Sequence, residues 1–200
     1  MAPESLLAAV DLGSNSFRLE IGRVGSHQRI ERVEYLKETV RQGNGLNERH
    51  ELTDEAMQRG WDCLARFAER IAGFKPSQVR AVATQTLREA RNREVFLAKA
   101  KTILGYPIEV ITGREEARLI YLGVSHLLPQ SPERRLVVDI GGRSTELIVG
   151  KGNKHRRVSV NDAAILELKR YLAHRGLIAL PCPPLIRQGP IIEQPQPPAV

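Results

Sequence analysis

Hydrophobic and polar positions along the chain predict a definite order of strands and helices. Three strand patterns come first, at 5–12, 16–24 and 27–43. Apolar and polar residues alternate in the second, which is expected to be the antiparallel partner of the first. Helical and strand patterns then alternate, with helices at 52–74, 92–105 and 114–128 and strands at 79–84 and 106–112. We expect Thr53 or Asp54 to cap the first helix and Gly105 to end the second. Strands that alternate with helices indicate an α/β fold with a mixed or parallel sheet.

The pattern then starts again. A new strand is predicted at 135–140, followed by a glycine turn, a second strand at 145–150 and a helix at 161–176. The restart predicts a second domain of similar plan. The last 20 positions hold seven of the 12 prolines, so we expect an extended or disordered segment there. The predicted divisions are a first domain over 1–130, a partial second domain over 131–176 and a proline-rich tail over 177–200.

Composition limits the class of protein. With 200 residues, 42% hydrophobic and 26% charged, the chain is typical of a globular protein, and it has no apolar run of membrane-spanning length. Its start lacks the features of a signal peptide, so none is expected. Cys63 and Cys182 form neither a disulfide framework nor a zinc pattern. These features predict a cytoplasmic, bacterial protein.

The chain is basic, with a net charge of +7 and a pI of about 9.8. Such a charge attracts polyanions such as nucleic acid, nucleotides or condensed phosphates. Seven of the basic residues lie in 151–175. A solvated basic face is favoured there over a specific nucleic-acid site.

One short motif occurs twice. The stretch VDLGSNS at 10–16 returns as VDIGGRS at 138–144, and each copy ends an apolar strand and precedes another. Glycine lets backbone N–H groups approach an anion, and the hydroxyl groups that follow can donate to phosphate oxygens. The pattern therefore favours two phosphate-binding loops over ordinary turns, although a single such turn would be weak support. No Walker A or dinucleotide-binding fingerprint is present.

Each copy also carries an aspartate at its strand end, Asp11 and Asp139. A carboxylate beside a phosphate repels it unless a cation lies between them, and Mg²⁺ is the cation that bridges carboxylates to phosphates most naturally. The repeat thus predicts two facing loops that bind one phosphate chain between them, with Mg²⁺ between the carboxylates and the phosphates.

The paired loops resemble those of the sugar kinase, heat-shock ATPase and actin superfamily. More narrowly, the chain resembles the exopolyphosphatase and guanosine pentaphosphate phosphohydrolase family through AAVDLGSNSFRLEI, ATQTLREARN, ITGREEARLIYLGV and LVVDIGGRSTELIVG. The resemblance covers about residues 6–150, and the segment from about Lys154 onward departs from it. It implies a ribonuclease-H-like (actin-like ATPase) domain with a mixed five-stranded sheet, followed by an incomplete second domain of the same plan.

The resemblance assigns roles to individual residues. Glu116 matches the catalytic glutamate, which acts as general base, although an acidic residue in the first turn of a helix is more often a capping residue. Glu115 points about 100° away around the helix, so only one of the two can face a given crevice. Asp139 matches a metal-associated carboxylate, Asp11 is its counterpart in the first loop, and Glu146 is either a third metal-facing carboxylate or an exposed strand residue.

The remaining candidates bind phosphate. They are Gly13, Ser14, Asn15 and Ser16 in the first loop, Gly141, Gly142, Arg143, Ser144 and Thr145 in the second, and the cations Arg18 and Arg88. Arg88 is favoured over Arg18, because Arg18 alternates with apolar neighbours and could face solvent. Arg143 stands where the family usually has a third glycine, and it either restricts the loop or adds a cation to the site.

The expected function is a phosphohydrolase that removes the terminal phosphoryl group from inorganic polyphosphate or guanosine pentaphosphate with Mg²⁺. Two alternatives stay open: a kinase of the same superfamily, of acetate or sugar kinase type, and a truncated remnant that binds phosphate weakly. The expected partners are these phosphate anions, without membrane or specific nucleic acid. The family resemblance is also compatible with a homodimer.

Overall fold

The structure is a computed structural model that describes residues 5–25, 30–128, 135–141, 143, 145–151, 154–159 and 170. The chain divides into two units, 1–160 and 161–200, and Arg170, which is helical, is the described residue of the second. The predicted helix at 161–176 otherwise lies outside the described residues, as does the proline-rich tail at 177–200. Among the described helices, none is both long and apolar enough to cross a membrane.

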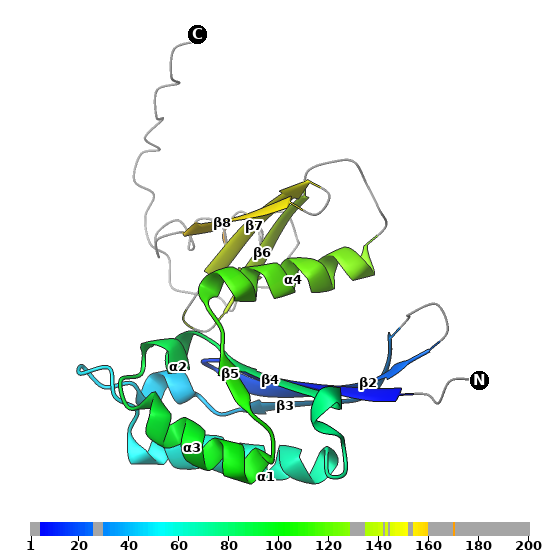
Figure 1. The fold of residues 1–200 in the computed structure, drawn as a ribbon. Coiled ribbons are helices and arrows are strands. Elements are labelled where there is room, and N and C mark those ends of the chain that lie inside the picture. Colours follow the sequence, from blue (N-terminus) through cyan, green and yellow to red (C-terminus); the bar gives the residue numbers. More distant parts are fainter. Residues whose placement is uncertain are drawn as a thin grey trace, which may run out of the picture. The chain divides into compact units, whose positions relative to one another are not determined.

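The first part of the chain forms a mixed sheet of five strands, in the order β3-β2-β1-β4-β5 (Figure 1). Antiparallel pairing joins β1 (Ser5–Leu12), β2 (Ser16–Val24) and β3 (Ile30–Thr39), whereas β4 (Val79–Ala83) runs parallel to β1 and β5 (Ile108–Val110) parallel to β4. The fold class predicted from the sequence is confirmed for this sheet. Because β1 and β4 are parallel, their carboxyl ends meet at one edge.

Helices α1 (Asp54–Arg70) and α3 (Arg93–Leu104) lie together on one face of this sheet (Figure 1). Alternate strand residues point into the core beneath them, including Val10, Leu12 and Leu19, each at most 2% exposed. The Thr53 side chain accepts a hydrogen bond from the amide of Ala56, so Thr53 is the N-cap of α1. Gly105 ends α3 with φ 82°, as its position predicted.

Short elements connect the strands near the carboxyl end of β1. They are the 3₁₀ turn η2 (Gln42–Gly45) and the short helix α2 (Gln85–Glu89), whereas a further 3₁₀ turn, η3 (Pro76–Gln78), lies near the opposite end of β1, where Gln78 donates to the carbonyl of Leu6. The sequence pattern did not indicate α2, because five residues are too few for an apolar period to be recognised. Both η2 and α2 support the functional site described below.

The chain continues through α4 (Gly113–Leu127) into three antiparallel strands, β6 (Arg135–Ile140), β7 (Thr145–Lys151) and β8 (Lys154–Ser159). Ala117 and Tyr121 of α4 and Ile148 of β7 form a small buried cluster. The strand β8 was not predicted. Its sequence, KHRRVS, is too basic to indicate a buried strand. Pairing with β7 makes this segment a strand, and that pairing cannot be read from the local sequence pattern.

The two hairpins that carry the repeated motif have the same register. In the first, Leu12 pairs with Phe17 and Asp11 with Arg18; in the second, Ile140 pairs with Thr145 and Asp139 with Glu146. Each aspartate therefore stands one residue before the end of its strand, opposite the residue seven positions later. The sequence repeat is a structural repeat as well.

Candidate active site

A cavity of about 280 Å³ lies at the carboxyl end of β1. Most of its lining is polar, and it brings together residues from both copies of the motif, two strands and α4. The lining residues are Asp11, Gly13, Ser14, Asn15, Ser16, Arg18, Lys37, Thr84, Glu116, Asp139, Ile140 and Gly141. All four predicted residues of the first loop and three of the four predicted acidic candidates, Asp11, Glu116 and Asp139, thus line one cavity.

The first loop is held in place from below by backbone hydrogen bonds. The carbonyl of Ser14 accepts from the amide of Gly43 at 2.8 Å, and the carbonyl of Asn15 accepts from the amide of Arg41, also at 2.8 Å. The Ser14 hydroxyl accepts from the hydroxyl of Thr86 at 2.7 Å. These bonds occupy the carbonyl groups of Ser14 and Asn15 with donors from the chain itself. A loop fixed in this way can present donors to an anion without further ordering.

Gly13 is required by close packing within this loop. A Cβ atom at Gly13 would lie 2.9 Å from the carbonyl oxygen of Ser16, and real Cβ atoms do not approach a backbone atom so closely. The tight turn between β1 and β2 therefore depends on glycine at this position.

Charged residues form a row across three strands at the cavity. Asp11 of β1 pairs with Arg18 of β2, and Arg18 pairs in turn with Lys37 of β3. The Arg18 guanidinium donates to the Asp11 carboxylate at 3.2 Å. Burial raises the pKa of Asp11; Arg18 opposes this rise, and the negative charges of Glu116 and Asp139 add to it. Because these negative charges raise the pKa, a cation bound at Asp11 would favour its charged form.

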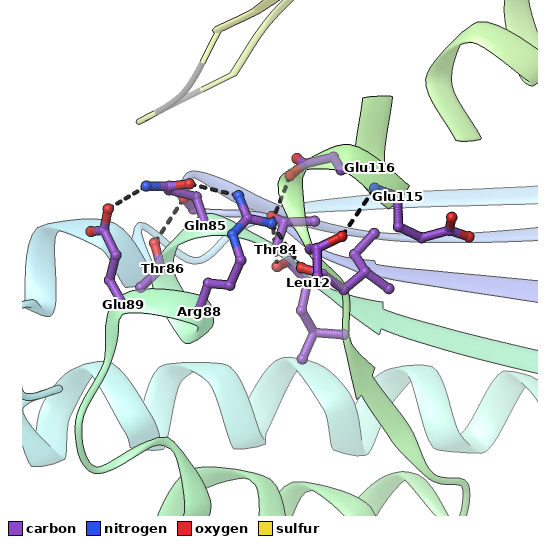
Figure 2. Close-up of polar contacts among 11 residues, drawn as sticks. Leu12, Thr84, Gln85, Thr86, Arg88, Glu89, Glu115 and Glu116 are labelled. Carbon is purple, nitrogen blue, oxygen red and sulfur yellow. Dashed lines mark hydrogen bonds and ion pairs between the residues drawn. The ribbon is translucent and has the colours of Figure 1, made fainter. Parts of the chain in front are cut away.

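Glu116 enters the cavity from the first turn of α4. The side chain of Thr112 caps this helix by accepting a hydrogen bond from the amide of Glu115. The Glu116 carboxylate accepts a hydrogen bond from Arg88 at 2.9 Å, and only 13% of its side chain is exposed. Glu115 points away from Glu116, as Figure 2 shows, and makes two hydrogen bonds to Arg118 at 2.7 Å each. The sequence expectation that only one of the two glutamates faces the crevice is confirmed.

Arg88 acts on Glu116 and is absent from the lining of the cavity. Its guanidinium donates to Glu116, to the carbonyl of Ile111 at 2.9 Å and to the side chain of Gln85 at 2.6 Å (Figure 2). Arg18, by contrast, lines the cavity. The preference for Arg88 over Arg18 as a phosphate contact therefore lacks geometric support, because the donors of Arg88 are directed at protein groups.

The second loop contributes Asp139, Ile140 and Gly141 to the cavity. Gly142 and Ser144 lie outside the described residues. Thr145 and Glu146 are described as backbone of β7, where Glu146 stands opposite Asp139. Arg143 is absent from the cavity lining and instead donates to the carbonyl of Gly43 at 3.0 Å. Of the two roles that its sequence position left open, this contact favours restriction of the loop.

Comparison with known proteins gives this geometry a context. The profile of the Ppx/GppA phosphatase family matches residues 21–179. The chain belongs to the Ppx/GppA phosphatase family. The match extends past Lys154, so the expectation that the family resemblance ends there is wrong: β8 and the positions up to 179 belong to the family's pattern, although their basic composition concealed this.

Solved structures of the Ppx/GppA family are similar to the chain. The Aquifex aeolicus PPX-GPPA enzyme is 30% identical with a TM-score of 0.70, over 86% of this chain and 62% of its own. An exopolyphosphatase from Cytophaga hutchinsonii is 26% identical with a TM-score of 0.71, over 85% and 60% of the two chains. The chain therefore spans about 60% of the length of these relatives.

Lys37, Thr84 and Ile140 line the cavity of this family member but were missed by sequence reasoning. Lys37 lies in an alternating strand whose register with β2 cannot be read from the sequence. Thr84 follows β4, and its amide donates to the carbonyl of Leu12 at 3.3 Å, which places it beside the first loop. A search for polar residues just after parallel strands would have found Thr84, whereas no local signal marks Lys37.

Asp11 and Asp139 are the residues that could hold Mg²⁺ in this family member. Within the described part of the chain, no three His, Cys, Asp or Glu side chains lie close enough together to form a metal site by themselves. Such a sparse donor set suits Mg²⁺, which commonly keeps several waters and takes only one or two carboxylates together with phosphate oxygens. The residues present are thus compatible with the predicted ion.

Proposed function

We propose that this chain provides the phosphate-binding and water-activating groups of a phosphohydrolase, which removes the terminal phosphoryl group from inorganic polyphosphate or guanosine pentaphosphate. The observation that carries the proposal is the convergence of two glycine loops and Glu116 on one polar cavity. Membership of the Ppx/GppA phosphatase family supports the reaction class. A structural relative that is named an exopolyphosphatase supports polyphosphate as one of the substrates.

Phosphate binding is assigned to the two loops and the adjacent cations. The first loop lines the cavity with Gly13, Ser14, Asn15 and Ser16, whose amide and hydroxyl groups are assigned as donors, and Arg18 and Lys37 extend positive charge from it along β2 and β3. Gly141 places the second loop on the cavity as well. A chain of phosphates needs several such donors in a row, because each phosphoryl unit carries its own charge. The two neighbouring cations, Arg18 on β2 and Lys37 on β3, match this need better than they match a single phosphate.

Glu116 is assigned the role of general base. Its carboxylate lies in the cavity beside the first loop, and Arg88 fixes its position without filling all of its acceptor sites. A water molecule that donates to the free acceptor sites of Glu116 would transfer a proton there as its oxygen attacks the terminal phosphorus. The bond between that phosphorus and the bridging oxygen breaks, and the shortened chain leaves with the electron pair.

Mg²⁺ is assigned to Asp11 and Asp139, with Glu146 as a third candidate ligand on the strand opposite Asp139. When bound, the ion supplies positive charge that offsets the charges of the phosphate oxygens. Arg18 supports Asp11 from the neighbouring strand and holds its carboxylate at the cavity. Donors fixed in advance then stabilise charge on the departing phosphate without reorganising.

Phosphate release from long-chain polyphosphate and from guanosine pentaphosphate tests the proposal, with Mg²⁺ present and with Mg²⁺ chelated. We expect Glu116→Gln to lower turnover about 10²- to 10⁴-fold, because that range is typical for the loss of a general base. Glu115→Gln is the matched control: its side chain is turned toward Arg118, and turnover should stay within about twofold. Equal activity of the wild type and Glu116→Gln would contradict the role of Glu116. A wild-type chain that releases no phosphate from either substrate would contradict the function.

A further inference from the structure

Arg143 of the second loop contacts two elements that support the first loop. Its Nη1 donates to the carbonyl oxygen of Gly43 at 3.0 Å, and its Nη2 lies 3.5 Å from the carboxylate of Glu89. Gly43 belongs to η2 and its amide donates to the first loop at Ser14. Glu89 is the last residue of α2. One side chain therefore links the second loop to both elements beneath the first.

The stem of Arg143 lies against Gly43. A Cβ atom at Gly43 would be 2.6 Å from Cδ and 3.2 Å from Cγ of Arg143, so any residue other than glycine would push the side chain away. Gly43 is buried and lies in a short turn. The close packing shows that the absence of a side chain at Gly43 provides the space in which Arg143 lies.

Glu89 connects Arg143 to the candidate general base through α2. The Gln85 amide group donates to the carboxylate of Glu89, and the carbonyl oxygen of Gln85 accepts from Arg88 at 2.6 Å (Figure 2). Arg88 donates in turn to Glu116. A continuous series of polar contacts thus runs from Arg143 through α2 to Glu116. Each member is oriented by the next, and such networks fix side chains more firmly than isolated pairs do.

We propose that Arg143 is a positioning residue, which fastens the second phosphate loop to η2 and α2 and so sets the distance between that loop and Glu116. It acts through Gly43 and Glu89 and does not itself bind phosphate. Its pair with Glu89 is partly exposed, with 39% of the Arg143 side chain accessible, and exposed pairs contribute little alone. The contact with Gly43 is therefore the stronger part of the fastening. This inference rests on the proposed function for its effect on turnover, but not for the fastening itself.

The proposed link between the second loop and the elements η2 and α2 is tested by the distribution of distances between two spin labels. One label replaces Val95 of α3, and the other replaces Leu127 of α4, which is 85% exposed and belongs to the helix that packs on β7. Cys182 is replaced by serine, while Cys63 is buried and should not react. We expect one narrow distribution for the parent chain. Arg143→Gly and Gly43→Ala should both broaden it, and Arg143→Lys should restore part of the narrow component. An unchanged distribution in Arg143→Gly would overturn the proposal, whether or not the chain is active.

Kinetics then separates positioning from phosphate binding. A positioning role predicts that Arg143→Gly and Gly43→Ala lower kcat about tenfold or more with little change in KM, since small displacements of reacting groups are costly. Glu89→Gln keeps the size of the side chain and one acceptor oxygen, which can still accept from Gln85, but removes the charge that faces Arg143, so a smaller loss of kcat is expected. A raised KM with normal kcat in Arg143→Gly would show that Arg143 binds phosphate directly, which overturns the proposal. If no variant and no parent chain releases phosphate, the proposed function fails while the label distances still decide the fastening.

Discussion

Arg88 and Glu116 form an ion pair at 2.9 Å in which 20% and 13% of the two side chains are exposed. The pair joins α2 to the first turn of α4, two elements that are 28 positions apart in the sequence. Glu116 lines the cavity and Arg88 does not. The arginine therefore serves the candidate base as an orienting partner, and the base reaches the cavity in a defined position.

The Arg88–Glu116 pair predicts how an arginine variant behaves. Arg88→Lys keeps the charge but cannot donate to Glu116, Ile111 and Gln85 together, since an ammonium group lacks the planar fork. We expect kcat to fall about ten- to a hundredfold, with KM within about twofold, because the base is misplaced while the phosphate contacts stay intact. Steady-state phosphate release at several substrate concentrations measures this. A rise in KM at unchanged kcat would instead support the sequence expectation that Arg88 contacts phosphate.

Lys37 is predicted to bind a phosphate group beyond the one that reacts. It lies at the far end of the row Asp11, Arg18, Lys37, and it lines the cavity. We expect Lys37→Gln to raise KM about three- to tenfold with kcat nearly unchanged, because a hydrogen bond to a charged group is lost without disturbing the base. The change should shrink at high salt. Arg32→Gln is the control, since Arg32 lies on the same strand and pairs with Glu20 outside the cavity. Equal effects from both variants would show a general loss of charge.

Gly60 is predicted to be required by the packing of α1 on α3. A Cβ atom at Gly60 would lie 2.8 Å from Cε2 of Phe96, a fully buried ring that stacks on Trp61 at 5.8 Å. Overpacking of this kind costs about 1–3 kcal/mol, whereas alanine gains at most about 1 kcal/mol of helix propensity. Gly60→Ala should therefore lower the free energy of unfolding.

Gly123 supplies a matched control for that variant. It also lies in a helix, α4, but a Cβ atom there would meet nothing within 4 Å. Gly123→Ala should be neutral or stabilising by up to about 1 kcal/mol, since helix propensity acts alone. Urea titrations of both variants and the parent chain measure the difference. Destabilisation of similar size in both would mean that the contact with Phe96 is not the cause.

Local patterns were sufficient to predict most of the fold. The five strands of the first sheet, the helices α1, α3 and α4 and the hairpin that repeats VDLGSNS follow from apolar spacing and from glycine, as Gly105 illustrates. The strand β8 escaped prediction because KHRRVS has a charged composition, and its pairing partner decides its conformation. Strand register is likewise a property of the assembled sheet, so the position of Lys37 beside Arg18 could not be foreseen.

Site residues could be predicted where the residue type and its neighbours in the sequence are sufficient to indicate the role. The first loop and Glu116 are of this kind. The roles of Arg88 and Arg143 depend on partners that are 28 and 100 positions away in the sequence, namely Glu116 and Gly43. Each guanidinium donates to protein groups, and only the folded chain reveals which partners each cation has. The presence of an arginine in a phosphate-binding motif is therefore not sufficient to assign a phosphate contact.

Asp11 is predicted to lower the stability of the chain at neutral pH in the absence of Mg²⁺. Burial, Glu116 and Asp139 raise its pKa above the ordinary value of 3.8 in spite of Arg18, so the folded state binds the proton more tightly than the unfolded state does. Stability from this group is then fully present below pH 3.8 and is lost as the pH rises through the folded pKa. Asp11→Asn removes the charge while keeping an acceptor for Arg18. With a chelator present, it should melt above the parent chain at pH 7, and the difference should vanish near pH 3.5.

Added Mg²⁺ should reverse the order of Asp11→Asn and the parent chain. A cation that binds the folded state at a hundred times its Kd contributes about 2.7 kcal/mol, and the parent chain alone retains the Asp11 carboxylate that would hold it. Thermal melts with and without Mg²⁺ measure this, with Asp62→Asn as the control, since Asp62 is exposed on α1 and lies outside the cavity. A melting temperature that Mg²⁺ raises equally in Asp11→Asn and in the parent chain would remove Asp11 from the metal site. The negative charges of Glu116 and Asp139 near Asp11 would then have to be offset by cations of the protein, of which Arg18 already pairs with Asp11.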